Sequence, residues 1–159
     1  MAIRRFFRVM DDQDTGLQKV LTVVSFLKRV DLFQGVPADY LASLADIVSE
    51  RGVYAGDKLF SEGDVGDCLY LVVSGRVRIF SGAREVALMG PQECIGEMAL
   101  LDGEPRSASA VVEQDGRVLR IASEDFRDLL ADHPAMGMAL LKTMAKRLRQ
   151  TLAHHAQAA

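Results

Sequence analysis

Glycine is concentrated in the middle of this 159-residue chain, where ten of its thirteen glycines fall between residues 52 and 116. They separate short apolar runs at 68–73, 76–80, 85–89, 108–113 and 116–121. In one run Val77 and Ile79 alternate with Arg76 and Arg78, which is typical of a strand with one face in water. Turn sequences divide the runs at 62–64, 74–75, 81–82 and 115–116. We therefore predict a small antiparallel barrel or jelly roll.

Apolar residues at helical spacing flank this glycine-rich region on both sides. Before it, a first helix is predicted over residues 15–30, and a second helix is predicted to end near Gly52. After it, Ser123 is expected to cap a third helix, and a last helix follows Pro134. The last helix carries an apolar stripe made of Met136, Leu140, Leu141, Met144, Leu148 and Leu152. We expect this stripe to cover another part of the molecule.

The composition is that of a single globular domain, with 49% hydrophobic and 26% charged residues. A net charge of −3 argues against nucleic acid as a partner. The last helix does carry four cations, Lys142, Lys146, Arg147 and Arg149. We interpret them as a solvated face. No apolar stretch approaches the roughly 18 residues that predict a transmembrane segment, so none is expected.

The two cysteines, Cys68 and Cys94, lie far apart and lack the Cys-x-x-Cys spacing of a thiolate metal site. They also suggest no disulfide framework, because a small disulfide-stapled protein usually has more cysteines at closer spacing. A reducing compartment fits this usage best, and we expect the chain to be cytoplasmic.

The residues from 95 to 110 contain most of the groups needed to hold a phosphate joined to a sugar. Gly96 lets the backbone approach a ligand closely, and the residues after it can begin a short helix whose free N–H groups suit a phosphate. Glu97 can accept a hydrogen bond from a ribose hydroxyl. Arg106 follows a set of turn-forming residues, so its planar guanidinium can fold back toward the same phosphate.

This run resembles the phosphate-binding cassette of the cyclic nucleotide-binding domain family, whose pattern is roughly Gly-Glu-x-Ala-Leu, a spacer, then Pro-Arg-Ser/Thr/Ala-Ala. Each position of that pattern is filled between residues 95 and 110. The resemblance assigns Arg106 and Ser107 to the phosphate, together with the backbone of Met98 and Ala99. It assigns Glu97 to the ribose 2′-hydroxyl and places the base in an apolar pocket that is less local in sequence.

The resemblance covers residues 26–152 and implies the architecture of the whole domain. It implies an α+β fold that is mainly β, with an eight-stranded antiparallel β-roll, or jelly roll, flanked by N-terminal helices and two C-terminal helices. Residues 1–25 are expected to form an N-terminal extension with the start of the first helix, and residues 153–159 a loose tail. The transcription factors of this superfamily continue into a helix-turn-helix, for which we expect no residues here.

The implied ligand is cAMP, with cGMP as the alternative, and no metal is expected. Ser107 stands where cGMP-selective members of the family often have threonine, which favours cAMP. Ile95 stands where an aromatic residue is common, and Cys94 precedes it, but neither difference removes a charged or hydrogen-bonding contact.

Enzymatic activity is not expected, because the nucleophile, P-loop, dinucleotide and zinc-protease motifs are all absent. The histidines, His133, His154 and His155, lie at a helix start and in the tail, where they cannot assemble the metal site of a phosphodiesterase. Two alternatives to a cyclic nucleotide sensor stay open. One is an interaction domain that keeps the barrel but does not use the pocket. The other is a sensor of a different small anion or a redox signal, with Cys68 and Cys94 as its candidates.

With a sensor and no visible effector, the chain is expected to signal to a protein effector, and an oligomer is left open. The resemblance implies that the last helix closes over the bound base as a lid. Fixed packing of that helix against the barrel is the alternative.

Overall fold

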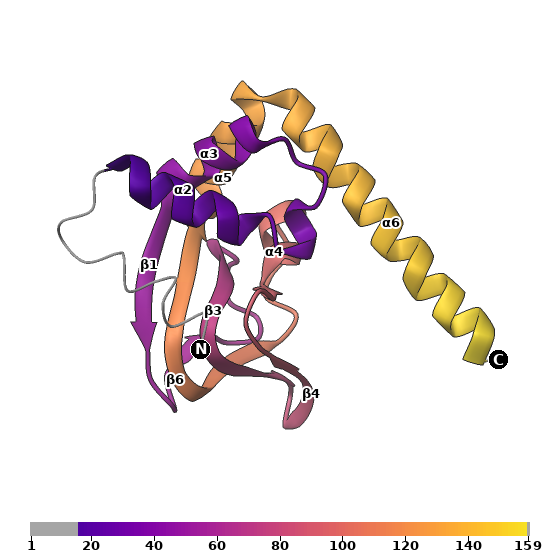
Figure 1. Cartoon of the computed structure of the whole chain (residues 1–159). Helices are drawn as coiled ribbons and strands as arrows, with labels where there is room; N and C mark the ends of the chain where they lie inside the picture. The colour runs from indigo at the N-terminus through magenta and orange to yellow at the C-terminus, as the bar shows by residue number, and fades with distance from the viewer. Residues whose placement is uncertain (1–15, 159) are drawn as a thin grey trace.

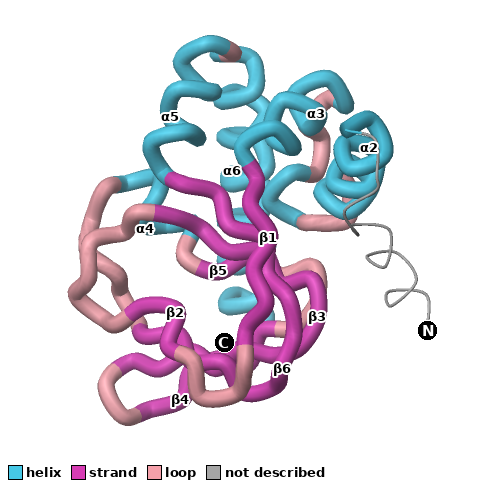
Figure 2. The backbone as a smooth tube through the Cα atoms, turned by 90° about the vertical axis from the view of Figure 1, so that its left-hand side faces the viewer, coloured by secondary structure: helices cyan, strands magenta, loops and turns pink. Residues whose placement is uncertain are grey.

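The computed structural model describes residues 16–158, which form a β-roll with helices gathered at one end (Figures 1 and 2). Among these residues, two helices and a helical turn precede the strands: α2 (Gly16–Leu27), η1 (Asp31–Phe33) and α3 (Ala38–Ile47). The strands are β1 (Val48–Val53), β2 (Lys58–Phe60), β3 (Cys68–Ser81), β4 (Arg84–Met89), β5 (Cys94–Ile95) and β6 (Ser109–Ala122). The short helix α4 (Glu97–Asp102) lies between β5 and β6, and α5 (Ser123–Asp132) and α6 (Pro134–Ala158) complete the chain.

Within the described residues, six strands form one antiparallel sheet with the order β1-β6-β3-β4, in which β2 also pairs with β6 and β5 with β3. The antiparallel α+β fold is thus confirmed, as a mixture of helices and one sheet, but the count of eight strands is not. β3 and β6 each run for 14 residues through a predicted turn. Counting each of these two as a pair of strands would give the expected eight.

The predicted turns at 74–75 and 115–116 are bends within paired strands rather than reversals of the chain. The pairing of β3 with β6 shifts register between Val72 and Val77, as at a β-bulge. The backbones approach so closely there that a Cβ added to Gly75 would lie 2.6 Å from the Gln114 carbonyl oxygen, and one added to Gly116 would lie 2.0 Å from that of Ser74. These glycines allow two strands to cross closely. The prediction that the chain reverses at each of them was wrong.

Residues 68–73 of β3 are buried on both faces, because the strand lies between two apolar clusters. Leu69, Leu71 and Val73 pack toward the helices, whereas Cys68, Tyr70 and Val72 belong to the interior of the roll. The helices α2, α3 and α5 supply the other side of the first cluster, with Phe26, Leu44 and Phe126 among their buried residues.

Four predicted helix boundaries differ from the structure. The first helix ends at Leu27 rather than at residue 30, because the N–H groups of Arg29 and Val30 donate to carbonyl oxygens three residues earlier, as in turns. The second helix ends at Ile47 rather than near Gly52, because the residues from Val48 pair with β6 as strand β1. Val48 follows Leu44 by four residues, which is the spacing of apolar residues on one face of a helix. The apolar pattern therefore does not show that a strand begins at Val48. Ser123 is the first residue of α5 and makes no side-chain cap; its backbone N–H donates to the Asp67 carbonyl oxygen instead. The tail expected to be loose from residue 153 is helical to Ala158.

The last helix, α6, is packed at its start and leads away from the roll beyond that (Figure 1). Met136 and Leu140 are buried in the first apolar cluster. Leu141, Leu148 and Leu152 are 63%, 61% and 60% exposed. Only the first part of the predicted apolar stripe therefore packs against the rest of the molecule. The expectation for residues 1–15, and for residue 159, lies outside the described residues.

Candidate functional site

The cassette is built around helix α4, which begins and ends at glycine. Gly96 precedes the helix in the left-handed region with φ 82°, and Gly103 follows it with φ 73°. The Gly103 N–H donates to the Ala99 carbonyl oxygen at 3.0 Å, which closes the helix after six residues. The chain then returns along an extended stretch to Arg106, so ten residues separate Gly96 from Arg106 in sequence while their groups are in contact.

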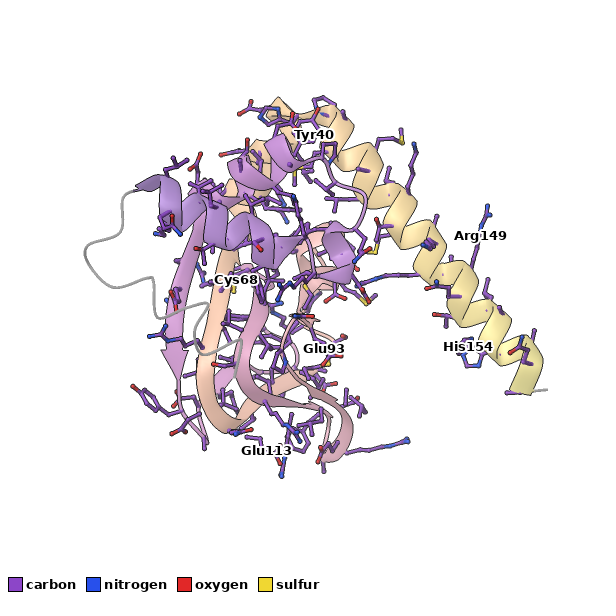
Figure 3. The ribbon with its side chains drawn as sticks, viewed as in Figure 1. Tyr40, Cys68, Glu93, Glu113, Arg149 and His154 are labelled. Carbon is purple, nitrogen blue, oxygen red and sulfur yellow. The ribbon has the colours of Figure 1, made fainter. Side chains whose placement is uncertain are left out.

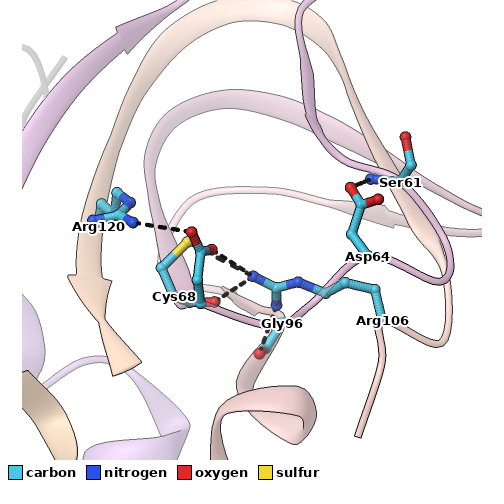
Figure 4. Close-up of polar contacts among 7 residues, drawn as sticks. Ser61, Asp64, Cys68, Gly96, Arg106 and Arg120 are labelled. Carbon is cyan, nitrogen blue, oxygen red and sulfur yellow. Dashed lines mark hydrogen bonds and ion pairs between the residues drawn. The ribbon is translucent and has the colours of Figure 1, made fainter. Parts of the chain in front are cut away.

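Arg106 is the only strongly buried cation among the described residues, with 3% of its surface exposed. Its Nη1 donates to the Gly96 carbonyl oxygen at 3.0 Å and its Nη2 to the Cys68 carbonyl oxygen at 2.6 Å (Figure 4). The nearest carboxylate oxygen in an ion pair, from Asp67, is 3.9 Å from Nη2 and belongs to a side chain that is 71% exposed. Nε has no hydrogen-bond partner within the described residues.

A loop that precedes β3 holds the backbone of Arg106. The Arg106 N–H donates to the Asp64 carbonyl oxygen and the Gly63 N–H to the Arg106 carbonyl oxygen, both at 2.8 Å. The loop itself is closed by the Ser61 N–H, which donates to the Asp64 carboxylate at 2.9 Å (Figure 4). Arg106 is thus fixed at both its backbone and its guanidinium by a segment about 40 residues earlier in the chain.

All six residues predicted for the site line one cavity of about 210 Å³: Gly96, Glu97, Met98, Ala99, Arg106 and Ser107. Arg106 is buried, Glu97 is half-buried, and Ser107 and Met98 lie at the surface. The rest of the lining is apolar and comes from β2, β3, β4, β5 and the segment before β6: Phe60, Ile79, Ala87, Met89, Cys94, Ile95 and Ala108. The cavity therefore combines one buried cation, one carboxylate and an apolar wall.

Glu97 connects the cavity to the last helix. Its Oε1 lies 3.8 Å from Nη1 of Arg147 on α6, and the two side chains are 23% and 34% exposed. Cys94 lies beside this pair: burial raises the pKa of its thiol well above the ordinary value, and the charge of Glu97 adds to that effect. The thiol is therefore neutral at neutral pH and acts as part of the apolar wall.

Behind Arg106, residues outside the cavity lining form a polar cluster that sequence reasoning did not find. Cys68 Sγ is 3.7 Å from Arg106 Nη2, and Asp67 lies 3.6 Å from Nη2 of Arg120. Burial raises the pKa of Tyr70, and its contact with Cys68 adds to the rise. Burial lowers the pKa of Arg120, but Cys68 and Asp67 outweigh it and the pKa is raised overall. The sequence indicated a turn at 62–64, an apolar run at 68–73 and Cys68 as a sensor candidate in this region, but none of these predicts the cluster.

The other candidate groups do not gather into a site. Cys68 and Cys94 are both free and buried. The ring of His133 packs against Tyr40 with centroids 5.4 Å apart, and His154 lies on α6 far from the roll (Figure 3). No cluster of three or more His, Cys, Asp or Glu side chains that could hold a metal ion is found in residues 16–158.

A second hollow, a groove of about 830 Å³, lies between α6 and the η1–α3 region. Its cations Lys142 and Lys146 are exposed, and Arg147 is half-buried. The groove is larger than the cassette cavity, but size alone does not show which of the two hollows is the better candidate for a ligand site. Exposed lysines keep their water and need no anion, whereas the guanidinium of Arg106 has lost its water, and its Nε has no protein partner in the described part of the chain.

The sequence profile described as the cyclic nucleotide-binding domain matches residues 50–133, which contain the entire cassette. The chain belongs to the cyclic nucleotide-binding domain family. This confirms the resemblance drawn from residues 95–110. No helix in the described part of this family member is both long and apolar enough to cross a membrane.

The chain is similar to proteins from two bacteria. A protein of Mycobacterium tuberculosis (strain H37Rv) named CRP-like cAMP-activated global transcriptional regulator is 33% identical over 130 residues, covering 79% of this chain and 58% of that protein. The Cyclic AMP receptor protein of Thermus thermophilus is 37% identical over 129 residues, covering 78% of this chain and 60% of that protein. The chain therefore spans about three fifths of the length of these relatives.

A solved structure of the N-terminal domain of a transcriptional regulator from Streptomyces coelicolor A3(2) has the same fold. It superposes with a TM-score of 0.71 at 35% identity, covering 79% of this chain and 94% of that one. The chain is thus a cyclic nucleotide-binding domain related to CRP-like regulators.

Proposed function

We propose that this domain binds cAMP in the cassette cavity, in preference to cGMP, and reports its occupancy to a protein effector through α6. Arg106 receives the cyclic phosphate, assisted by Ser107 and by the backbone N–H groups of Met98 and Ala99. Glu97 accepts the ribose 2′-hydroxyl, while the apolar wall of the cavity receives the base.

One observation carries this proposal: Arg106 is buried, yet its hydrogen-bond acceptors are two carbonyl oxygens and the sulfur of Cys68. Its ion pair with Asp67 is long, at 3.9 Å, and that carboxylate belongs to an exposed side chain. Burying an uncompensated charge is costly, and buried cations are normally paired with an anion. The Nε of Arg106, which lacks a partner within the described residues, leaves a donor for that anion. A cyclic phosphate carries one negative charge and fits this requirement.

The choice of cAMP rests on a residue and on the relatives. Ser107 lacks the threonine methyl group found at the matching position in many cGMP-selective members. The two bacterial relatives carry cAMP in their names, and their similarity extends over more than three quarters of this chain. The free, buried thiols of Cys68 and Cys94 suit a reducing compartment, which supports a cytoplasmic site of action.

One contact and one exposed surface support signalling through α6. The ion pair between Arg147 and Glu97 joins the helix to a residue proposed to touch the ribose. Beyond that pair, Leu148 and Leu152 are exposed and offer an apolar face to a partner. A ligand shifts the position of α6 only if it binds the two arrangements with different affinity, and Glu97 is the group through which that difference can arise.

Thermal unfolding with added nucleotides tests the binding proposal. At about 100 times its dissociation constant, cAMP should add about 2.7 kcal/mol to the free energy of unfolding, which raises the melting temperature by about 5 to 10 °C for a chain of this size. cGMP should require a higher concentration for the same shift. Linear AMP, with its open phosphate and extra charge, is the matched control and should give a much smaller shift. Equal shifts from cAMP and AMP would instead indicate a general anion site, and no shift from cAMP would contradict the proposal.

A further inference from the structure

The guanidinium of Arg106 lies over an aromatic ring from an earlier strand. Its Cζ is 4.1 Å from the centroid of the Phe60 ring, well inside the roughly 6 Å within which a cation and a ring attract each other. Phe60 is the last residue of β2 and is paired with Ala110 of β6. The ring comes from a position 46 residues before Arg106, so the contact depends on the closure of the roll.

The kinds of partner around Arg106 are unusual for a buried cation. Its Nη atoms donate to two carbonyl oxygens and to the sulfur of Cys68, and the Asp67 carboxylate is 3.9 Å away on an exposed side chain. A buried carboxylate in van der Waals contact would neutralise the guanidinium and compete with an incoming anion. The negative face of an aromatic ring stabilises the cation without a formal charge. The guanidinium therefore remains available to a ligand anion.

Phe60 is itself fixed in place by its neighbours. Its ring stacks with that of Tyr70 at a centroid distance of 6.4 Å and an interplanar angle of 21°. Tyr70 is 5% exposed and belongs to the inner apolar cluster, against which Phe60 also packs. The Phe60 ring is also close to Gly96, since a Cβ added there would lie 3.4 Å from its Cε1. A platform held in this way can hold the guanidinium in one orientation.

We propose that Phe60 is a positioning residue that holds the guanidinium of Arg106 oriented for the phosphate of the nucleotide. This inference rests on the proposed function, because the benefit of an oriented guanidinium is realised only when an anion binds. Phe60 also lines the cavity. A residue that acted only as a wall would depend on the shape of the ring, whereas a positioning residue depends on the negative charge density of its face.

Fluorinated phenylalanines at position 60 separate these two roles, because fluorine withdraws electron density from the ring face with little change in shape. We expect cAMP affinity, measured by calorimetry, to fall in steps from phenylalanine to the 4-fluoro, 3,5-difluoro and 3,4,5-trifluoro analogues. Phe60→Leu, which removes the ring, should weaken binding by about 3- to 30-fold. The same trifluoro analogue at Phe126, buried in the other apolar cluster, is the control and should leave the affinity unchanged.

The same series distinguishes the possible failures. Equal affinity across the fluorinated series, in a protein that binds cAMP, would overturn the positioning role of Phe60 alone. Absence of cAMP binding by the unchanged chain would overturn the proposed function and the positioning role with it. The contact itself is checked without ligand by NMR: the Arg106 side-chain resonances should carry an upfield ring-current shift that Phe60→Leu removes, and resonances that do not move would show that the guanidinium does not lie over the ring.

Discussion

Gly96 is the position where one added methyl group should disturb the candidate site most directly. In Gly96→Ala, the new Cβ would lie 2.2 Å from Nη1 and 3.2 Å from Cζ of Arg106. A contact this short cannot persist, so the guanidinium must move away and lose its hydrogen bond to the Gly96 carbonyl oxygen. Position 96 also has φ 82°, which disfavours any residue with a Cβ.

The two effects have different sizes and different readouts. A hydrogen bond from the guanidinium to the phosphate of cAMP should contribute roughly 1.5 to 3 kcal/mol, so displacing Arg106 from that phosphate should weaken cAMP binding by about 10- to 150-fold. The left-handed backbone should cost a further 1 to 2 kcal/mol or so of folding stability, which lowers the melting temperature by about 2 to 8 °C. Calorimetry measures the first effect and thermal unfolding without ligand measures the second.

Gly35→Ala is the matched control for this experiment. Gly35 has φ 81°, but an added Cβ there meets nothing within 4 Å. It should therefore reproduce the loss of stability and keep the affinity for cAMP. If Gly96→Ala bound cAMP as tightly as Gly35→Ala, the orientation of Arg106 could not be what sets the affinity, and the reasoning would be refuted.

Three further predictions concern single side chains. Arg106→Ala should weaken cAMP binding by about 30-fold or more, because removing one partner of a desolvated charge pair costs roughly 2 to 5 kcal/mol; calorimetry on the folded variant checks this, and a change of only a few-fold would remove Arg106 from the site. Arg147→Ala should change the free energy of unfolding by less than about 1 kcal/mol, since its ion pair is partly exposed. We expect cAMP to slow hydrogen exchange over residues 134–152, and Arg147→Ala should abolish this slowing. If the slowing persists, α6 must be coupled to the cavity by other contacts. Because the pKa of Cys94 is raised in the folded protein, the unfolded chain releases this proton first as the pH rises. The free energy of unfolding should therefore fall above about pH 8.5, by up to about 1.4 kcal/mol per pH unit for this thiol. Urea titrations at a series of pH values measure this fall, and Cys94→Ala should make the free energy of unfolding depend less steeply on pH. An unchanged pH dependence would mean that Cys94 does not contribute.

The candidate site could be predicted in part because half of it is contiguous. Gly96, Glu97 and Arg106 lie within eleven residues, and the turn between them brings their groups together locally. The other half, from Phe60 to Cys68, reaches Arg106 only through the closure of the roll. Neither periodicity nor spacing indicates which ring or carbonyl lies behind a given arginine. The sequence therefore predicts the candidate binding groups that line the cavity, but not the residues that support them.

The fold was predictable at the level of its class for a similar reason. Alternating apolar residues and frequent glycines specify strands locally, but a glycine does not show whether the chain reverses or bends. Ser74-Gly75 and Ser81-Gly82 carry the same two residue types; the first lies inside β3 and the second joins β3 to β4. The difference comes from β6, which continues to pair with β3 past the first glycine.

The position of β3 between two apolar clusters has a consequence for how this domain tolerates mutation. In most strands with one wet face, every second position accepts polar residues, and a scan of all substitutions shows an alternating pattern. From Cys68 to Val73 both faces are covered, by helices on one side and by the apolar interior of the roll on the other. This segment should therefore appear in such a scan as an unbroken block of sensitive positions. Losses at Leu69, Leu71 and Val73 should act through folding of the helical end, and losses at Cys68 and Tyr70 should also reach ligand affinity.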